Sequence, residues 1–266
     1  MWGPVNVHIR FRGTIRERSV DPYLALLRWA RDKRRVRGVL WDVSSGGGAD
    51  IPSTDLYLAV KRLAHVKPVV ASIGSVAASG GYLATLGARR IYAYRSSIVG
   101  SIGVISPHVA LRGLLDRLGI EVELLHHGKH KDAYQMIRPL TEEERRKALE
   151  AAEPSYRHFV ETVALERHRP YEEILPLATG EYWSGEQARH LGLIDAIGDR
   201  EEALTELSRL SGVPTTRTVQ VSPPRGLLQR VLGEPGLALR QAMVQGAREG
   251  LEDLLWEGLD SEGAVR

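Results

Sequence analysis

The 266-residue sequence contains no cysteine. Disulfide bonds, zinc sites with cysteine ligands and catalytic thiols are therefore excluded, while the redox compartment stays open. Apolar runs long enough to cross a membrane are also missing, and the first ten residues are too polar for a signal peptide. We expect a soluble chain that is cytoplasmic or peripherally attached to a membrane.

Neither sign of charge is in large excess, because 36 basic residues face 33 acidic ones. An arginine-rich run at 31–37 has no interleaved aromatic residues, so it fits a solvated helix end better than a nucleic-acid site. We therefore expect no nucleic-acid partner. A hydrophobic content of 43% is enough for one large domain, alone or with an appendage.

The first third of the chain alternates between strand and helix patterns. Apolar and polar residues alternate at 5–11, a helix pattern opens at Asp21, and buried-type strands follow at 38–43 and 69–73 with a helix from Ser53 or Thr54 between them. Such βαβ units predict an α/β fold with a parallel sheet. Later elements are expected as helices at 77–88, 112–118 and from Thr141, and as strands at 90–93, 100–105 and 122–125.

The last fifty residues have a different character. We expect residues 1–213 to form the main domain and 214–266 to form a linker, with one possible strand, and a helical tail. The tail carries an apolar stripe that includes Leu239, Met243 and Leu251. Such a stripe needs a partner surface, and the acidic residues beside it favour a neighbouring subunit over a lipid face.

One serine stands where a nucleophile would be well placed. The stretch 69–82 reads as a buried strand, a turn of very small residues and a helix that begins near Ser79. Free backbone N–H groups at such a helix start, from Gly80 and its neighbours, can stabilise an oxyanion. Gly80 and Gly81 also leave room for a substrate backbone. The alternative is that Ser79 only caps the helix.

A nucleophilic serine needs a base, and the segment 126–132 (H-H-G-K-H-K-D) offers two kinds. Three histidines cluster there, but no carboxylate spacing suggests a triad, and exposed loop histidines are commoner than a metal site. Lys129 and Lys131 are the other candidates, because a lysine kept neutral by burial acts as a base. From composition alone, surface lysines are the commoner interpretation.

In four motifs the chain resembles the signal peptide peptidase A family of Ser/Lys serine proteases, which is related to the ClpP and crotonase folds. The resemblance covers roughly residues 5–198, and the motifs are V-A-A-S-G-G-Y (76–82), G-S-I-G-V-I (100–105), G-K-H-K-D (128–132) and the segment 183–198. The resemblance implies a ClpP/crotonase-like fold, Ser79 as nucleophile and Lys131 as base. It also implies that Ser101 orients the lysine.

The loop after the second strand departs from the family pattern. Where the family has D-S-P-G-G, this chain has S-S-G-G-G at 44–48, so Gly46 replaces a proline. The resemblance still implies that Gly47 and Gly81 contact the substrate and that Gly48 and Gly80 donate the two oxyanion N–H groups. We expect no membrane anchor of the family's usual kind in this chain, so the resemblance implies the chemistry and not a signal-peptide substrate.

The resemblance further implies a peptide substrate, no cofactor or metal, and a homo-oligomeric ring of the kind in which serine and lysine can come from neighbouring subunits. Asp132 follows Lys131 directly, and in an extended segment its carboxylate would point away from the lysine. We then expect activity to rise on the alkaline side of neutrality. Two alternatives stay open: a non-catalytic ring that binds peptides or membrane proteins, and a crotonase-type acyl-CoA enzyme.

Overall fold

The computed structural model describes residues 3–223, and the tail stripe expected at 227–259 lies outside them. By internal contacts, the described residues up to Ser222 belong to one compact unit. In the described part of the chain, no helix is long and apolar enough to cross a membrane.

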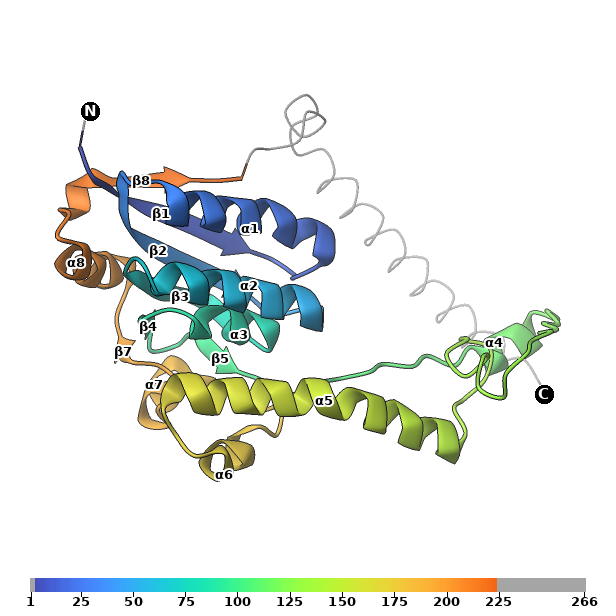
Figure 1. The fold of residues 1–266 in the computed structure, drawn as a ribbon. Helices are drawn as coiled ribbons and strands as arrows, with labels where there is room; N and C mark the ends of the chain where they lie inside the picture. The colour runs from blue at the N-terminus through green and yellow to red at the C-terminus, as the bar shows by residue number, and fades with distance from the viewer. Residues whose placement is uncertain (1–2, 224–266) are drawn as a thin grey trace, which may run out of the picture. The chain divides into compact units, whose positions relative to one another are not determined.

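A mostly parallel sheet forms the centre of this unit (Figure 1). Its hydrogen-bonded order is β6-β5-β3-β2-β1-β8, with β4 pairing both β3 and β7, and only the β5–β6 pair is antiparallel. The strands are β1 (Val5–Arg12), β2 (Val36–Ser45), β3 (Val69–Ala78), β4 (Arg90–Ala93), β5 (Ile98–Gly100), β6 (Tyr182–Ser184), β7 (Ala196–Ile197) and β8 (Thr218–Val221).

Helices connect and cover these strands, which confirms the predicted α/β class. They are α1 (Glu17–Asp32), α2 (Asp50–Ala64), α3 (Gly80–Leu86), α4 (Arg112–Arg117), α5 (Glu142–Arg167), α6 (Tyr171–Ile174), α7 (Gly185–His190) and α8 (Arg200–Ser211), with short 3-10 turns at Leu175–Leu177 and Thr215–Arg217.

Both faces of the central strands are buried, because helices pack on each side. Trp41 of β2 joins the main core with the side chains of α1, α2 and α3, and its indole N–H donates to the Ala84 carbonyl at 3.0 Å. Leu40, the residue before Trp41 on β2, faces the opposite way and packs with Leu207 of α8. This double burial explains why apolar residues stand next to one another in β2 and β3, as at 39–41 and 69–71, instead of alternating with polar ones.

Several predicted elements need correction. The first helix begins at Glu17 rather than Asp21, because Ser19 caps it by accepting from the Arg16 N–H at 2.9 Å. The strand β3 extends to Ala78, so α3 is shorter than predicted. Residues 101–105 leave the sheet after β5, and 122–125 do not form a strand. The expected division at 213/214 stays a prediction, although β8 pairs with β1 and so joins residues 218–221 to the sheet.

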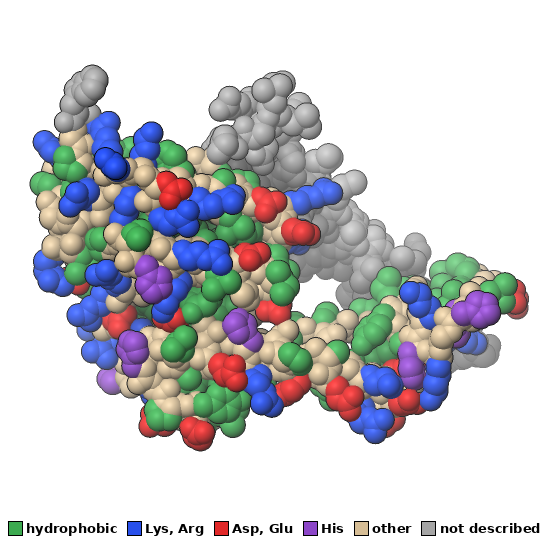
Figure 2. Space-filling model, viewed as in Figure 1, with side chains coloured by type: hydrophobic (Ala, Val, Ile, Leu, Met, Phe, Trp, Pro, Cys, Tyr) green, Lys and Arg blue, Asp and Glu red, His purple; other side chains and the backbone are tan. Residues whose placement is uncertain are grey.

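Residues 103–141 form a segment that we call the arm. It links β5 to α5 and includes α4. Between Gly103 and Leu140 only Ala133 is buried. On the face drawn in Figure 2, histidine, acidic and basic side chains gather on this part of the molecule together with apolar ones. The arm ends at Thr141, whose hydroxyl accepts from the Glu144 N–H and so forms a capping box with Glu144 at the start of α5.

Candidate active site

Ser79 stands between β3 and α3 with a free hydroxyl. It occupies the N-cap position of α3 but makes no capping hydrogen bond with its side chain. The cap residues Thr141 and Ser184 both do so in their helices. Its backbone has φ 51 and ψ −129, a conformation that strongly favours glycine. The interpretation of Ser79 as a simple capping residue is therefore wrong, and the hydroxyl is available for chemistry.

The sheet register brings Ser101 beside Ser79. The last residues of β3 and β5, Ala78 and Gly100, are paired partners, so each serine is the first residue after its strand. The Ser79 N–H donates to the Gly100 carbonyl at 2.8 Å. Ser101 also has φ 51, and its N–H donates to the Glu181 carbonyl at 2.6 Å. Two strained serines thus meet at the carboxyl end of the sheet, where parallel sheets place their sites.

The two predicted oxyanion donors lie next to each other. A Cβ built on Gly80 would be 3.6 Å from the Gly48 nitrogen. Gly48 pairs with Ile15 in an isolated bridge, but that bridge uses the Gly47 carbonyl and the Ala49 N–H. The N–H groups of Gly48 and Gly80 take part in none of the hydrogen bonds found within residues 3–223. Both donors are therefore free for a ligand.

Gly47 and Gly81 shape the site rather than line it. A Cβ on Gly47 would lie 2.8 Å from the Ser79 Cβ and 2.9 Å from the Gly80 nitrogen, and its φ of +98 disfavours any side chain. A Cβ on Gly81 would run into the Ser45 carbonyl. Neither residue lines the cavity described next, so the structure gives them a packing role where substrate contact was expected.

A cavity of about 590 Å³ opens over these residues. Ser79, Ser101, Gly48 and Gly80 all line it. The other lining residues come from the loop after β2, from α2, α3 and α5, and from the segments 103–105 and 178–180: Gly46, Ala49, Asp50, Ser53, Leu83, Gly103, Val104, Ile105, Ser155, Tyr156, Phe159, Ala178, Thr179 and Gly180. A cavity of this size accommodates several side chains of an extended peptide.

Sequence reasoning missed the contribution of α5 to this cavity. Phe159 is buried, and the Tyr156 hydroxyl donates to the Ala178 carbonyl at 2.9 Å. Burial raises the pKa of Tyr156, which keeps the phenol neutral. The helical spacing of these aromatic residues was the available signal, but it is shared by any core-facing helix. Ser53, taken as a helix cap, is instead buried behind Gly80 and donates to the Ala49 carbonyl at 2.7 Å.

The structure does not bring Lys131 to Ser79 within one chain. Lys131 is exposed on the arm and is not among the residues that line the cavity. Around it lie the predicted histidines, which contact carboxylates: His126 Nε2 is 3.9 Å from Asp132 and His130 Nε2 is 3.3 Å from Glu143. Among residues 3–223, no group of three or more histidine and acidic side chains is placed to hold a metal ion.

Several proteins with similar sequences are named as proteases. The model of peptidase family S49 matches residues 61–214. A putative protease of Methanocaldococcus jannaschii is 38% identical over 74% of this chain, and a putative protease of Synechocystis is 31% identical over 83%. The chloroplastic serine protease SPPA of Arabidopsis thaliana is 31% identical over 89% of it.

These relatives differ in length. The chain spans 64% of the Methanocaldococcus protein, 80% of the Synechocystis protein and 35% of the Arabidopsis protein. The family match spans the chain from before β3 to beyond α5 and so includes Ser79, Ser101 and Lys131. This family has a ClpP-like fold, so the fold predicted from the motifs is confirmed. The chain belongs to peptidase family S49, the signal peptide peptidase A family.

Proposed function

We propose that this protein is a serine endopeptidase in which Ser79 of one copy works with Lys131 of a neighbouring copy. The observation that carries the proposal is the Ser79 hydroxyl: it is free of capping bonds, it lines a cavity of about 590 Å³, and two unpaired backbone N–H groups lie beside it. Nucleophilic catalysis needs these parts together with a base.

The reaction follows from the roles of these groups. The neutral Lys131 amine takes the proton from Ser79 Oγ, and Oγ attacks the carbonyl carbon of the peptide bond. The N–H groups of Gly48 and Gly80 donate to the oxygen as it becomes negative. The Lys131 ammonium then protonates the leaving amine, and the same lysine activates the water that releases the acyl group from Ser79. Ser101, which also lines the cavity, orients the lysine.

A neighbouring copy supplies the base because the arm carries Lys131 away from the cavity of its own chain. The arm also exposes many large apolar side chains, more than a solvated loop needs. They are Val104, Ile105, Val109, Leu114, Leu118, Ile120, Val122, Leu124, Leu125, Tyr134 and Met136. Docking the arm on a second copy buries these side chains and delivers Lys131 at the same time. Repeated around an axis, that contact closes a ring.

The substrate is an extended peptide with apolar side chains. Val104, Ile105 and Phe159 give the cavity apolar walls, and residues 103–105 continue from β5 without a strand partner of their own in the described chain. A peptide placed beside them would bind as an added strand. Remnants of signal peptides and segments of membrane proteins have this chemistry, which suits a ring at or near a membrane. The proposed chemistry uses neither metal nor cofactor.

Mixing two inactive variants tests the shared site. Ser79→Ala removes the nucleophile and Lys131→Met removes the base, so each variant alone is expected to be inactive. If the variants are co-expressed at equal levels, about a quarter of the junctions in a head-to-tail ring combine an intact Ser79 with an intact Lys131. We expect about a quarter of wild-type hydrolysis and about a quarter of wild-type fluorophosphonate labelling, which corresponds to labelling of about half of the Ser79 residues present in the mixed rings.

Two results would contradict the proposal. Activity of Lys131→Met alone would remove the lysine from the mechanism. Mixed rings without activity, when light scattering shows that both variants assemble together, would place serine and base in the same chain. A wild-type protein that neither hydrolyses a peptide library nor reacts with the fluorophosphonate would favour the non-catalytic ring.

A further inference from the structure

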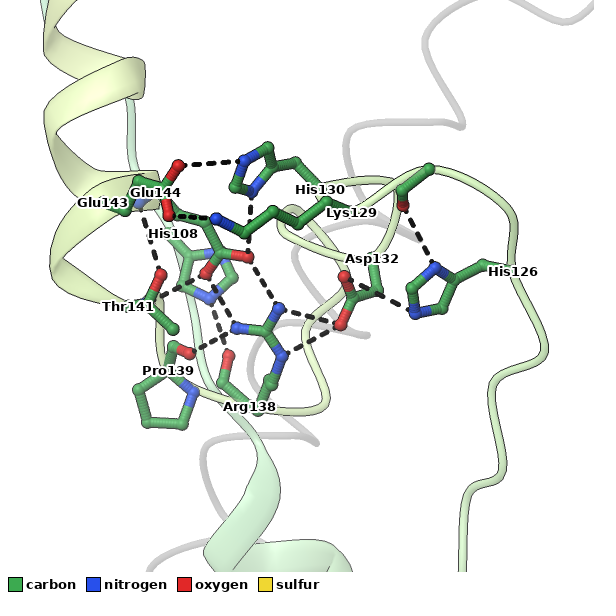
Figure 3. Close-up of polar contacts among 11 residues, drawn as sticks. His108, His126, Lys129, His130, Asp132, Arg138, Pro139, Thr141, Glu143 and Glu144 are labelled. Atoms are coloured by element: carbon green, nitrogen blue, oxygen red, sulfur yellow. Dashed lines mark hydrogen bonds and ion pairs between the residues drawn. The ribbon is translucent and has the colours of Figure 1, made fainter.

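Arg138 connects the turn that carries Lys131 to the start of α5 (Figure 3). Its guanidinium has five N–H groups, and all five have acceptors. Nε and Nη2 donate to Asp132 Oδ2 at 3.0 and 2.8 Å. Nη1 and Nη2 donate to the two Glu144 oxygens at 2.8 and 2.7 Å, and Nη1 also donates to the Pro139 carbonyl at 3.0 Å. A fully paired guanidinium holds both carboxylates in one geometry.

The two carboxylates belong to different elements, the turn that carries Lys131 and the start of α5. Asp132 is the residue after Lys131. Glu144 is buried and forms the capping box of α5 by accepting from the Thr141 N–H at 2.8 Å. Bonds from Arg138 hold the pKa of Asp132 and that of Glu144 below their usual ranges, so both stay ionised at neutral pH. The turn that carries Lys131 is thus fastened to the first turn of α5, directly after the arm.

The backbone around Lys131 explains why the contact between Arg138 and Asp132 matters. We expected an extended segment that would turn the Asp132 carboxylate away from Lys131, but residues 129–134 form a turn. The Lys131 N–H donates to the Gly128 carbonyl at 3.1 Å, and the Ala133 N–H to the His130 carbonyl at 3.3 Å. Strand geometry therefore does not separate the neighbouring side chains. Instead, Arg138 engages the carboxylate, and within residues 3–223 the Lys131 ammonium makes no ion pair.

We infer that Arg138 is a positioning residue for Lys131: by engaging the Asp132 carboxylate and fixing the turn on α5, it denies the lysine a counter-ion that would hold it in the protonated, inactive form. A carboxylate within a few ångströms of an ammonium favours the charged state of both. The inference rests on the proposed function, because it concerns the same base.

The other charged groups near the turn are engaged elsewhere. Lys129 Nζ donates to Glu143 at 2.6 Å, and His130 lies 3.3 Å from Glu143 and 3.8 Å from Glu144. His126 is 3.9 Å from the Asp132 oxygen that Arg138 does not bind. His108 contacts the Arg138 carbonyl at 2.9 Å. Of these groups, only Asp132 is adjacent to Lys131 in sequence. Loss of its bonds to Arg138 should therefore affect the protonation of Lys131 most directly.

Arg138→Gln in the assembled full chain tests the inference. The change frees Asp132 to pair with Lys131, so the alkaline limb of the activity profile should move up by about one pH unit, with roughly tenfold less activity at neutral pH. Adding Asp132→Asn to Arg138→Gln should return the midpoint to its wild-type position, although the rate stays low because the turn is no longer fastened. Arg146→Gln removes the same charge from α5, where its contact is with Glu150 at 3.6 Å, and should leave the profile unchanged.

A second readout is independent of activity. The chain has only six lysines, so the NMR signals of its ¹³C-dimethylated lysines can be assigned one by one. The signal that disappears in Lys131→Arg belongs to Lys131. The midpoint of the Lys131 signal should rise in Arg138→Gln and return in the double variant. An unchanged midpoint in Arg138→Gln, or a midpoint that stays raised in the double variant, would overturn the inference.

The two readouts separate failure of the inference from failure of the proposed function. If the Lys131 signal shifts as expected while hydrolysis does not depend on Lys131, the contact network stands and the dyad is wrong. If hydrolysis depends on Lys131 but neither midpoint moves, Arg138 is only structural. Should Arg138→Gln fail to fold, Arg138→Lys keeps the charge with fewer donors, and a smaller shift in the same direction is expected. Absence of any shift there would also overturn the inference.

Discussion

Ser79 and Ser101 follow directly on two paired residues, Ala78 and Gly100, and each has a backbone φ of 51. Non-glycine residues at such angles cost roughly 1–3 kcal/mol each, so two at one sheet edge are retained against a stability cost. Both serines line one cavity. The backbone strain can be measured separately from the chemistry, because glycine and alanine at residue 79 both remove the hydroxyl but only glycine relaxes the backbone.

Ser79→Ala and Ser79→Gly are expected to abolish hydrolysis equally but to differ in stability. Both remove the nucleophile, which should lower the rate by three or more orders of magnitude. Only glycine relieves the strained backbone. The free energy of unfolding of Ser79→Gly should therefore be about 1 kcal/mol higher than that of Ser79→Ala, and its melting temperature roughly 2–4 °C higher. Equal melting temperatures would show that the strain is not stored at this residue, and retained hydrolysis would remove Ser79 from the mechanism.

The glycine loop after β2 should respond very differently at adjacent positions. Nothing lies within 4 Å of a Cβ built on Gly46, so Gly46→Ala should keep nearly wild-type activity and stability. A Cβ on Gly47 would press on Ser79 and Gly80, so Gly47→Ala should displace the nucleophile and cut activity by at least tenfold. Peptide hydrolysis and fluorophosphonate labelling measure both. A strong loss in Gly46→Ala would mean that the missing family proline matters to catalysis.

The parts of this site that could be predicted are those encoded by short-range patterns. Small residues between a buried strand and a helix indicated Ser79, and the motif order indicated Ser101 and Lys131. The register that pairs Ala78 with Gly100 could not be read from the sequence, because it depends on long-range packing. Residues 122–125 have a strand-like pattern but remain exposed and unpaired in the described chain, since no sheet edge reaches them.

A buried ion cluster on the other side of β2 gives a prediction about pH. Asp42 is 1% exposed and accepts from His8 at 3.0 Å, Arg12 at 2.6 Å and Arg200 at 3.0 Å. Burial raises the pKa of Asp42, but the bonds from His8 and Arg12 outweigh it and hold the pKa well below its usual range. Because the folded pKa is the lower one, Asp42 stabilises the fold above its unfolded pKa of about 3.9, and this contribution is lost as the pH falls further.

Asp42→Asn should therefore lower the free energy of unfolding by about 3 kcal/mol at neutral pH, because several cations lose their shared carboxylate. Urea titrations at a series of pH values should show the difference from wild type shrinking below about pH 4. Arg209→Gln removes an exposed arginine that pairs with Glu206 at 2.8 Å, and should change stability little. A difference for Asp42→Asn that is independent of pH would indicate lost packing rather than lost charge.

Substrate preference should depend on Asp50, because it is the one carboxylate among the residues that line the described cavity. It is the first residue of α2, and the Ser155 hydroxyl donates to its Oδ2 at 2.6 Å, which holds the carboxylate at the cavity wall. Peptides that place a lysine or arginine in this cavity should be cleaved faster than their neutral counterparts.

Asp50→Asn should lower kcat/KM for such cationic peptides about fivefold, as an exposed pair is worth about 1 kcal/mol, and leave neutral peptides unaffected. Added salt should reduce the preference in the wild type but have no effect on the variant. Ser155→Ala keeps the carboxylate and should retain most of the preference, whereas an equal loss for cationic and neutral peptides in Asp50→Asn would assign Asp50 to the fold of the site instead of its specificity.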